Sequence, residues 1–195
     1  MSECLGDVFD SILAKAAAKG WHVEEFLNAG ADEAYIRDSA SEAGLAFPEQ
    51  LVELYGWRNG TRMKEGDDMD VRHFFPGFVF LALEDAIASY NAAEDDSRWS
   101  SSWFPVFGNG GGDFYAVACD ESSPDFGAVV GFIADEAEQP IEFESVSSLV
   151  KTIRDCFLGN AYFVSGKGFL EANERSAAAT AKKHNPSLEI YRDIE

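Results

Sequence analysis

WFPVFGNGGGDFYAVACD, residues 103–120, is the stretch that decides the fold of this chain. Gly108 and the run Gly110 to Gly112 can take positive φ without a steric penalty, and Asn109 tolerates the left-handed region better than most residues. The chain can therefore reverse sharply here. The residues that follow, 114–119, are apolar at every position, which is typical of a strand buried on both faces. The stretch predicts a strand, a tight turn and a second strand.

Further strands are expected on both sides of this hairpin, at 128–134, at 141–143 and at 74–81, where Pro76 and Gly77 mark a bend or an edge. The turns at 120–127 and 135–140 are too short for a crossover helix, so neighbouring strands must run antiparallel. Amphipathic or capped segments predict helices at 5–16, 32–44, 48–58, 83–90 and 145–157, and residues 169–183 are alanine-rich and suit a helix. Residues 61–73 are polar and predict a mobile surface loop. This order predicts an α+β fold, with a central, mainly antiparallel sheet flanked by helices.

Composition excludes several functional classes. The 195 residues and the hydrophobic fraction of 46% suit one folded domain with appendages. With 35 acidic and 15 basic residues, the formal charge of −20 disfavours binding to nucleic acid or to anionic lipid and favours a basic partner.

No apolar run approaches the roughly 18 residues of a membrane span, and no signal peptide is evident. Cys4, Cys119 and Cys156 show no C-x-x-C spacing, so we expect free thiols in the cytoplasm.

No residue pattern indicates catalysis, a cofactor or a metal. The glycine cluster is followed by Asp113 and not by Gly-Lys-Ser/Thr, so it is expected to be a structural turn and not a phosphate loop. Asp113 either braces this turn or contacts a ligand, and the first role is favoured. No G-x-S-x-G elbow is present. Histidines and acids occur without the spacing of zinc or calcium ligands: His22, His73, His184, Glu65, Asp67, Asp68 and Asp70.

The acidic residues are unevenly distributed. Between Arg98 and Lys151 the chain has no lysine or arginine, while acids accumulate in the two turns. These acids are either a solvated surface or a docking face for a basic protein. The candidate partner-binding residues are Asp120, Glu121, Asp125, Asp135, Glu136 and Glu138, together with Trp99. Trp57, Trp99 and Trp103 suit either a core or an interface, and the core is favoured; Trp99, which follows Arg98 and precedes serines, is the best candidate for exposure at an interface.

Several short motifs occur in a characteristic order. A proline-led helix ending in Asn-Gly contains Pro48, Leu51, Tyr55, Asn59 and Gly60, and Phe80-Leu81 precedes the helix at 83–90. A tryptophan-proline segment and a Gly-Asp strand contain Trp103, Pro105, Val106, Gly112, Asp113 and Tyr115, followed by Val129-Val130 and the helix from Ser145 to Phe157. This order resembles the SUKH superfamily, which includes the yeast Smi and Knr cell-wall regulators and many bacterial immunity proteins.

The resemblance covers residues 30–160 and implies a SUKH-like α+β domain. Residues 1–29 would then be an added N-terminal helical extension, and residues 161–195 a C-terminal helical extension and tail packed on the same domain. The family implies a non-enzymatic scaffold that binds proteins, and it brings no catalytic residues. The expected function is that of a bacterial immunity protein that neutralises a cognate toxin by binding it, for example a basic toxin of the nuclease type. The alternative is an intracellular scaffold or regulatory module, and an enzyme, suggested only by the abundant carboxylates, ranks third.

Overall fold

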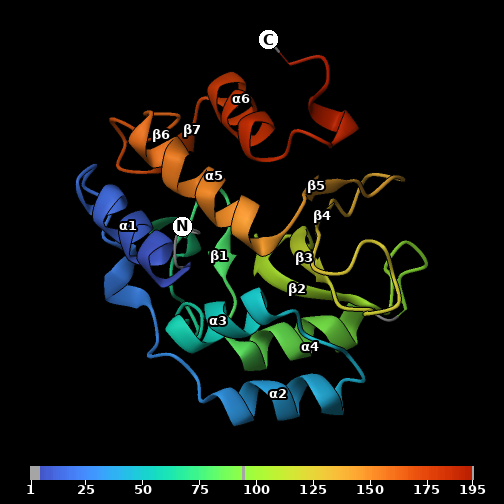
Figure 1. Ribbon diagram of the computed structural model, residues 1–195. Coiled ribbons are helices and arrows are strands. Elements are labelled where there is room, and N and C mark those ends of the chain that lie inside the picture. The colour runs from blue at the N-terminus through green and yellow to red at the C-terminus, as the bar shows by residue number, and fades with distance from the viewer. Residues whose placement is uncertain (1–4, 94, 195) are drawn as a thin grey trace.

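Five antiparallel strands form the central sheet of the computed structural model, which describes residues 5–93 and 95–194. The strands lie side by side in chain order: β1 (Val79–Phe80), β2 (Trp103–Gly108), β3 (Phe114–Ala118), β4 (Val129–Phe132) and β5 (Ile141–Phe143). Helices α3 (Glu49–Trp57) and α4 (Leu83–Ala93) lie against one side, with α2 (Glu33–Glu42) beyond them (Figure 1). The predicted α+β fold with an antiparallel sheet is confirmed.

The glycine hairpin joins β2 to β3 as the sequence predicts, with Phe104 opposite Val117 and Gly108 opposite Phe114. Gly110 and Gly112 have φ of 73° and 104°, a region that side chains with a Cβ rarely occupy. The side-chain oxygen of Asn109 accepts hydrogen bonds from the backbone N–H groups of Gly111 (2.8 Å) and Asp113 (3.1 Å). The turn is therefore closed by its own polar residues.

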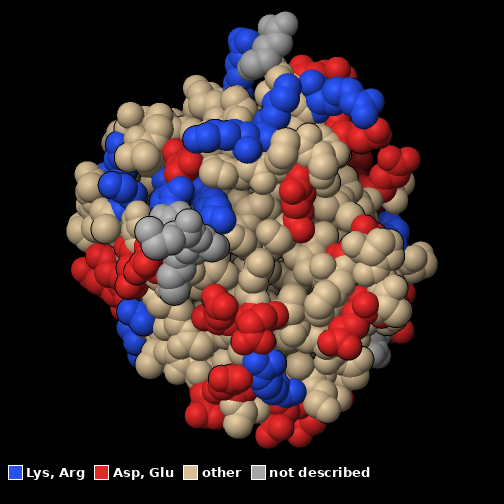
Figure 2. All heavy atoms as spheres, in the orientation of Figure 1, with Lys and Arg blue, Asp and Glu red and all other residues tan. Residues whose placement is uncertain are grey.

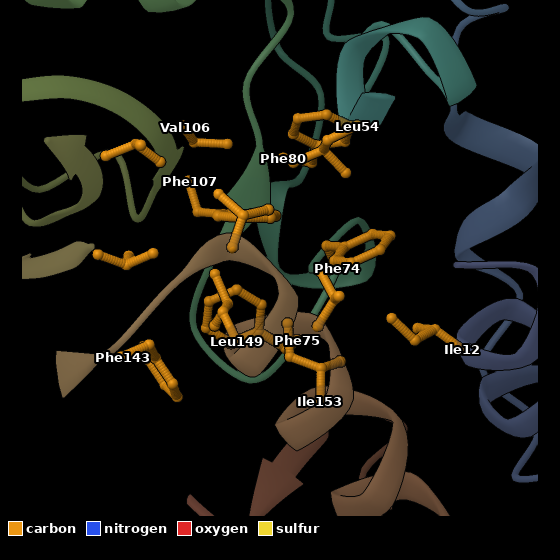
Figure 3. Packing of buried hydrophobic residues seen from close by; sticks show 14 of the residues in the cluster. Ile12, Leu54, Phe74, Phe75, Phe80, Val106, Phe107, Phe143, Leu149 and Ile153 are labelled. Atoms are coloured by element: carbon orange, nitrogen blue, oxygen red, sulfur yellow. The ribbon is translucent and has the colours of Figure 1, made fainter. Parts of the chain in front are cut away.

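Helix α5 (Val146–Leu158) packs on the sheet and joins it to both ends of the chain. Ser145 and Ser148 form a reciprocal capping box that fixes where this helix begins. Figure 3 shows Leu149 and Ile153 of α5 directed toward Phe75 and Phe107 of the sheet region. Each such fully buried large apolar side chain contributes about 1.5–3 kcal/mol through removal from water. Helices α1 (Leu5–Ala17) and α6 (Glu174–His184) lie on opposite flanks of α5 (Figure 1).

The first strand is much shorter than the predicted 74–81. Pro76 and Gly77 form a reversal in which the backbone N–H of Phe74 donates to the carbonyl of Phe78 at 2.8 Å. Gly77 has φ of 84°, and proline has no N–H to give to a strand ladder, so pairing with β2 begins only at Val79. The 61–73 loop contains a short 3-10 helix, Met69–Val71, and an ion pair of 2.6 Å between Arg72 and Asp67.

The C-terminal segment is more elaborate than the predicted alanine-rich helix. A small hairpin, β6 (Tyr162–Val164) and β7 (Leu170–Ala172), precedes α6, and a 3-10 helix, Glu189–Tyr191, follows it. Leu170, Ala181 and Tyr191 belong to the same hydrophobic cluster as residues of α1 and of the sheet. The segments before residue 30 and after residue 160 thus share one core with the middle of the chain. Within residues 5–93 and 95–194, no helix is both long and apolar enough to cross a bilayer.

Candidate protein-docking surface

The six acidic candidates are all exposed, as predicted, but they form two separate surfaces. The first acidic turn, residues 120–127, connects β3 to β4, and the second acidic turn, residues 135–140, connects β4 to β5. Because these strands are antiparallel, the two turns lie at opposite ends of β4. The sequence could not show this separation, and a single docking face built from both turns is not what the fold provides.

One carboxylate of the first acidic turn, that of Asp120, stabilises the turn itself. Asp120 accepts hydrogen bonds from the backbone N–H (2.9 Å) and the hydroxyl (2.7 Å) of Ser122, and these bonds lower the pKa of its carboxyl group. The turn lies beside a polar hollow that includes Gly44, Ala46 and Ser102. Glu121 and Asp125 are exposed on the same turn.

The second acidic turn is held by Gln139 of the turn itself and by Arg98, which lies outside it. Gln139 accepts from the N–H of Ile133 (2.7 Å) and donates to the carbonyls of Ile133 (3.0 Å) and Glu136 (2.8 Å). Arg98 donates to the carbonyls of Ala134 and Glu136 and pairs with Asp96 at 2.7 Å. The basic residue that precedes the acidic run therefore folds back onto it, which no local sequence pattern indicates.

The carboxylates of the second turn remain available to a partner. Asp135, Glu136 and Glu138 are exposed, and none of them forms an ion pair with any residue that the structure describes. Beside them runs a groove of about 510 Å³ lined by Ile133, Pro140 and Ile190, whose side chain is 43% exposed. The groove combines an apolar wall with an acidic rim. Sequence reasoning missed Ile190 because it comes from the C-terminal segment.

Trp99 is not an exposed anchor, contrary to the prediction. Its exposed fraction is 8%, and its ring meets Trp103, Phe114 and Phe132 edge-on at centroid distances of 5.9, 5.8 and 5.0 Å. Phe114 and Phe132 are cross-strand partners on β3 and β4, and Trp99 covers this pair. Trp99 is therefore a core residue, although its neighbours in the sequence are polar.

The motif residues at the α3–α4 junction have structural roles. Pro48 occupies the N-cap position, so α3 begins one residue later than predicted, and Tyr55 is fully buried against Phe80 and Phe104. The Asn59 side chain accepts a hydrogen bond from the N–H of Leu83 (2.8 Å). Gly60 has φ of 67°, and a Cβ there would lie 2.2 Å from the backbone nitrogen of Ala82. Asn59-Gly60 therefore fixes the approach of α3 to the start of α4.

The motif residues of the hairpin likewise lie in its framework. Pro105 stands at a register shift in β2, and Trp103 packs edge-on to Trp99. Gly112 provides the positive φ of the turn, and Asp113 accepts from Asn109 (2.7 Å) and from the N–H of Ala134 (2.9 Å). Asp113 thus braces the turn. Tyr115 differs from the others because its hydroxyl donates to Glu142 at 3.0 Å, at the edge of a cleft.

Figure 2 shows how charge is distributed on one face of the molecule. Acidic side chains are spread over the lower half and along the right-hand edge, whereas many of the basic ones gather near α1 and α6. Among the described residues, no three His, Cys, Asp or Glu side chains come together in a way that would hold a metal ion. Cys119 and Cys156 are free and buried, and Cys4 lies outside the described residues.

Comparison with known protein families identifies a match. The sequence model of the SMI1 / KNR4 family (SUKH-1) matches residues 30–152. No curated protein matches the chain. The matched range includes the α3–α4 junction, the glycine hairpin and both acidic turns, and it ends within α5.

Proposed function

Because the chain belongs to the SMI1 / KNR4 family (SUKH-1), whose members generally bind protein partners and are generally non-enzymatic, we propose that it is an immunity protein. It neutralises a cognate toxin with a basic surface by binding and occluding it, without chemistry. The proposal includes a cytoplasmic location, where thiols such as Cys119 and Cys156 stay reduced.

The observation that carries the proposal is the second acidic turn. Three exposed carboxylates, Asp135, Glu136 and Glu138, project from a backbone that Gln139 and Arg98 hold in place. A rigid acidic surface of this kind attracts a cationic protein and loses little conformational entropy when it binds. The adjoining groove with Ile190 supplies apolar contact area next to the charges.

The first acidic turn is a secondary candidate. Asp120, Glu121 and Asp125 are exposed, yet Asp120 is already engaged with Ser122. Because the two acidic turns lie at opposite ends of β4, one small partner cannot be centred on both. Lysine substitutions in the first turn therefore serve as a control for those in the second turn.

A co-expression experiment tests the proposal. Expression of this chain together with the toxin encoded beside it should restore growth of the host cell. Replacing Asp135, Glu136 and Glu138 by lysine should reduce that protection, whereas the same replacement of Glu121 and Asp125 should leave most of it.

Two results would count against the proposal. Full protection by the triple variant would exclude the second turn as the docking surface. Stable capture of endogenous proteins from the native cell, with no protection against the neighbouring toxin, would instead support the scaffold or regulatory alternative.

A further inference from the structure

A cleft of about 290 Å³ lies between the sheet and the C-terminal segment. Its aromatic walls come from four parts of the chain: Phe75 and Phe78 before β1, Tyr115 on β3, Phe143 on β5, and Tyr162 and Tyr191 after α5. The volume is near the lower end of the roughly 300–1,000 Å³ of ligand pockets, which suits a single side chain better than a large molecule. The spacing of these residues in the sequence does not indicate that the four parts of the chain meet.

A β-bulge places a carboxylate in this cleft. Val129 pairs with Phe143 and Val130 pairs with Ile141, so Glu142 is an extra residue in β5. Regular alternation would put Glu142 and Phe143 on opposite faces of the sheet, but here both line the cleft. Gly131 makes room for this arrangement, since a Cβ at that position would lie 2.1 Å from Oε1 of Glu142.

The Glu142 carboxylate is oriented but not neutralised. Its Oε2 accepts from the hydroxyl of Tyr115 (3.0 Å), and its backbone carbonyl accepts from the hydroxyl of Tyr191 (2.9 Å). Among the described residues, Oε1 has no hydrogen-bond donor. Burial raises the pKa of Glu142, and the hydrogen bond from Tyr115 only partly opposes this rise. A carboxylate in such a place gains most from a cation.

No described residue in the walls of the cleft carries a positive charge. The second ionisable acid there is Glu174, in the first turn of α6, and none of the described residues lining the cleft is lysine, arginine or histidine. Aromatic ring faces attract cations electrostatically, most strongly where water is excluded. An anion would meet two carboxylates, so the chemistry of the cleft selects a cationic group.

We propose that this cleft receives one arginine or lysine side chain of the protein partner, between the aromatic walls and the carboxylate of Glu142. The inference rests on the proposed function for the identity of the occupant. Glu142 lines both this cleft and the groove beside the second acidic turn, so the two sites adjoin at this residue. The turn attracts the basic partner, and the cleft holds its central cationic anchor.

The test uses the full chain and N-acetyl-arginine methylamide as the probe, followed by NMR titration of the backbone amides. The neutral isostere N-acetyl-citrulline methylamide is the matched ligand control. The arginine probe should shift amides of β5, β7 and α6 in a saturable way and bind at least about tenfold more tightly than citrulline, which corresponds to about 1.4 kcal/mol. The lysine analogue reports which of the two cations is preferred.

Three variants locate the binding. Glu142→Gln should reduce arginine affinity about tenfold or more, since it removes the charge and keeps the size. Gly131→Ala should have a similar effect because its Cβ displaces the side chain of Glu142. It provides a second test if the Glu142→Gln protein is unstable. Glu42→Gln, at an exposed position on α2, should bind as the unmodified protein does.

Equal affinity for arginine and citrulline, or unchanged affinity in both cleft variants, would overturn the inference. These outcomes are distinct from failure of the proposed function. If the probe does not bind but co-expression protects the cell, the cleft inference falls and toxin neutralisation stands. If the probe binds at Glu142 and no toxin is neutralised, the cleft accepts cations and the proposed function falls.

Discussion

The carboxylate of Asp113 accepts a hydrogen bond of 2.9 Å from the backbone N–H of Ala134 and thereby ties the glycine hairpin to the residue that immediately precedes the second acidic turn. The other oxygen of the same carboxylate accepts from the amide of Asn109 at 2.7 Å. One side chain therefore closes its own turn and positions the neighbouring one. The framework of the hairpin and the presentation of the acidic turn are physically connected.

Replacing Asp113 by alanine should lower the free energy of unfolding by about 1–3 kcal/mol, since it leaves partly buried donors without an acceptor. Chemical denaturation measures this loss. Asp113→Asn keeps an acceptor oxygen for Ala134 and should cost less than the alanine variant. Equal stability of Asp113→Ala and the unmodified protein would show that the two turns are not coupled through this side chain.

Gly60→Ala should be among the most damaging single substitutions at a glycine. The left-handed backbone alone costs about 1–2 kcal/mol for a residue with a Cβ, and the 2.2 Å approach to Ala82 adds to this cost. Gly20, with φ of 80° and no neighbouring atom within 4 Å of a new Cβ, is the matched control. Thermal unfolding should show a clearly larger decrease in Tm for Gly60→Ala than for Gly20→Ala, and similar decreases would contradict the packing argument.

The sequence predicted the hairpin, the sheet direction and most helices because these depend on local signals: glycine turns, caps and apolar periodicity. Ser145 marks the start of α5 for this reason, and Gly108 to Asp113 mark the hairpin. Trp99 was misplaced because its burial depends on Phe114 and Phe132, which approach only after β3 and β4 pair. The Glu142 cleft was missed since a register shift and the distant Tyr191 create it, and neither leaves a local pattern.

The stability of the protein should depend on pH through Glu142. Burial raises its pKa in the folded state above the usual value of 4.5, so the folded state favours the protonated form. The favourable contribution is complete below the unfolded pKa and is lost as pH rises through the folded pKa. The stability of Glu142→Gln relative to that of the unmodified protein should therefore increase as pH rises from 4 to 8. A stability difference between the two proteins that does not change with pH would contradict this account.

The buried thiols should resist alkylation while the protein is folded. Burial raises the pKa of Cys156 to about 11 and raises that of Cys119 strongly, so little reactive thiolate exists near neutral pH. A Cys4→Ser variant isolates these two residues. Mass spectrometry after iodoacetamide treatment should show slow modification in buffer and rapid modification in denaturant, and rapid modification in buffer would mean that the core opens readily.

The association rate of the purified chain with its cognate toxin, measured by stopped flow at increasing salt, tests the central claim most directly. The account predicts a fast, salt-sensitive rate, because electrostatic steering accelerates encounter by roughly 10 to 10³ at low ionic strength. Lysine at Asp135, Glu136 and Glu138 should remove most of this acceleration, whereas lysine at Glu121 and Asp125 should remove little. A rate that is independent of salt and unchanged by the triple substitution would contradict docking on the second acidic turn.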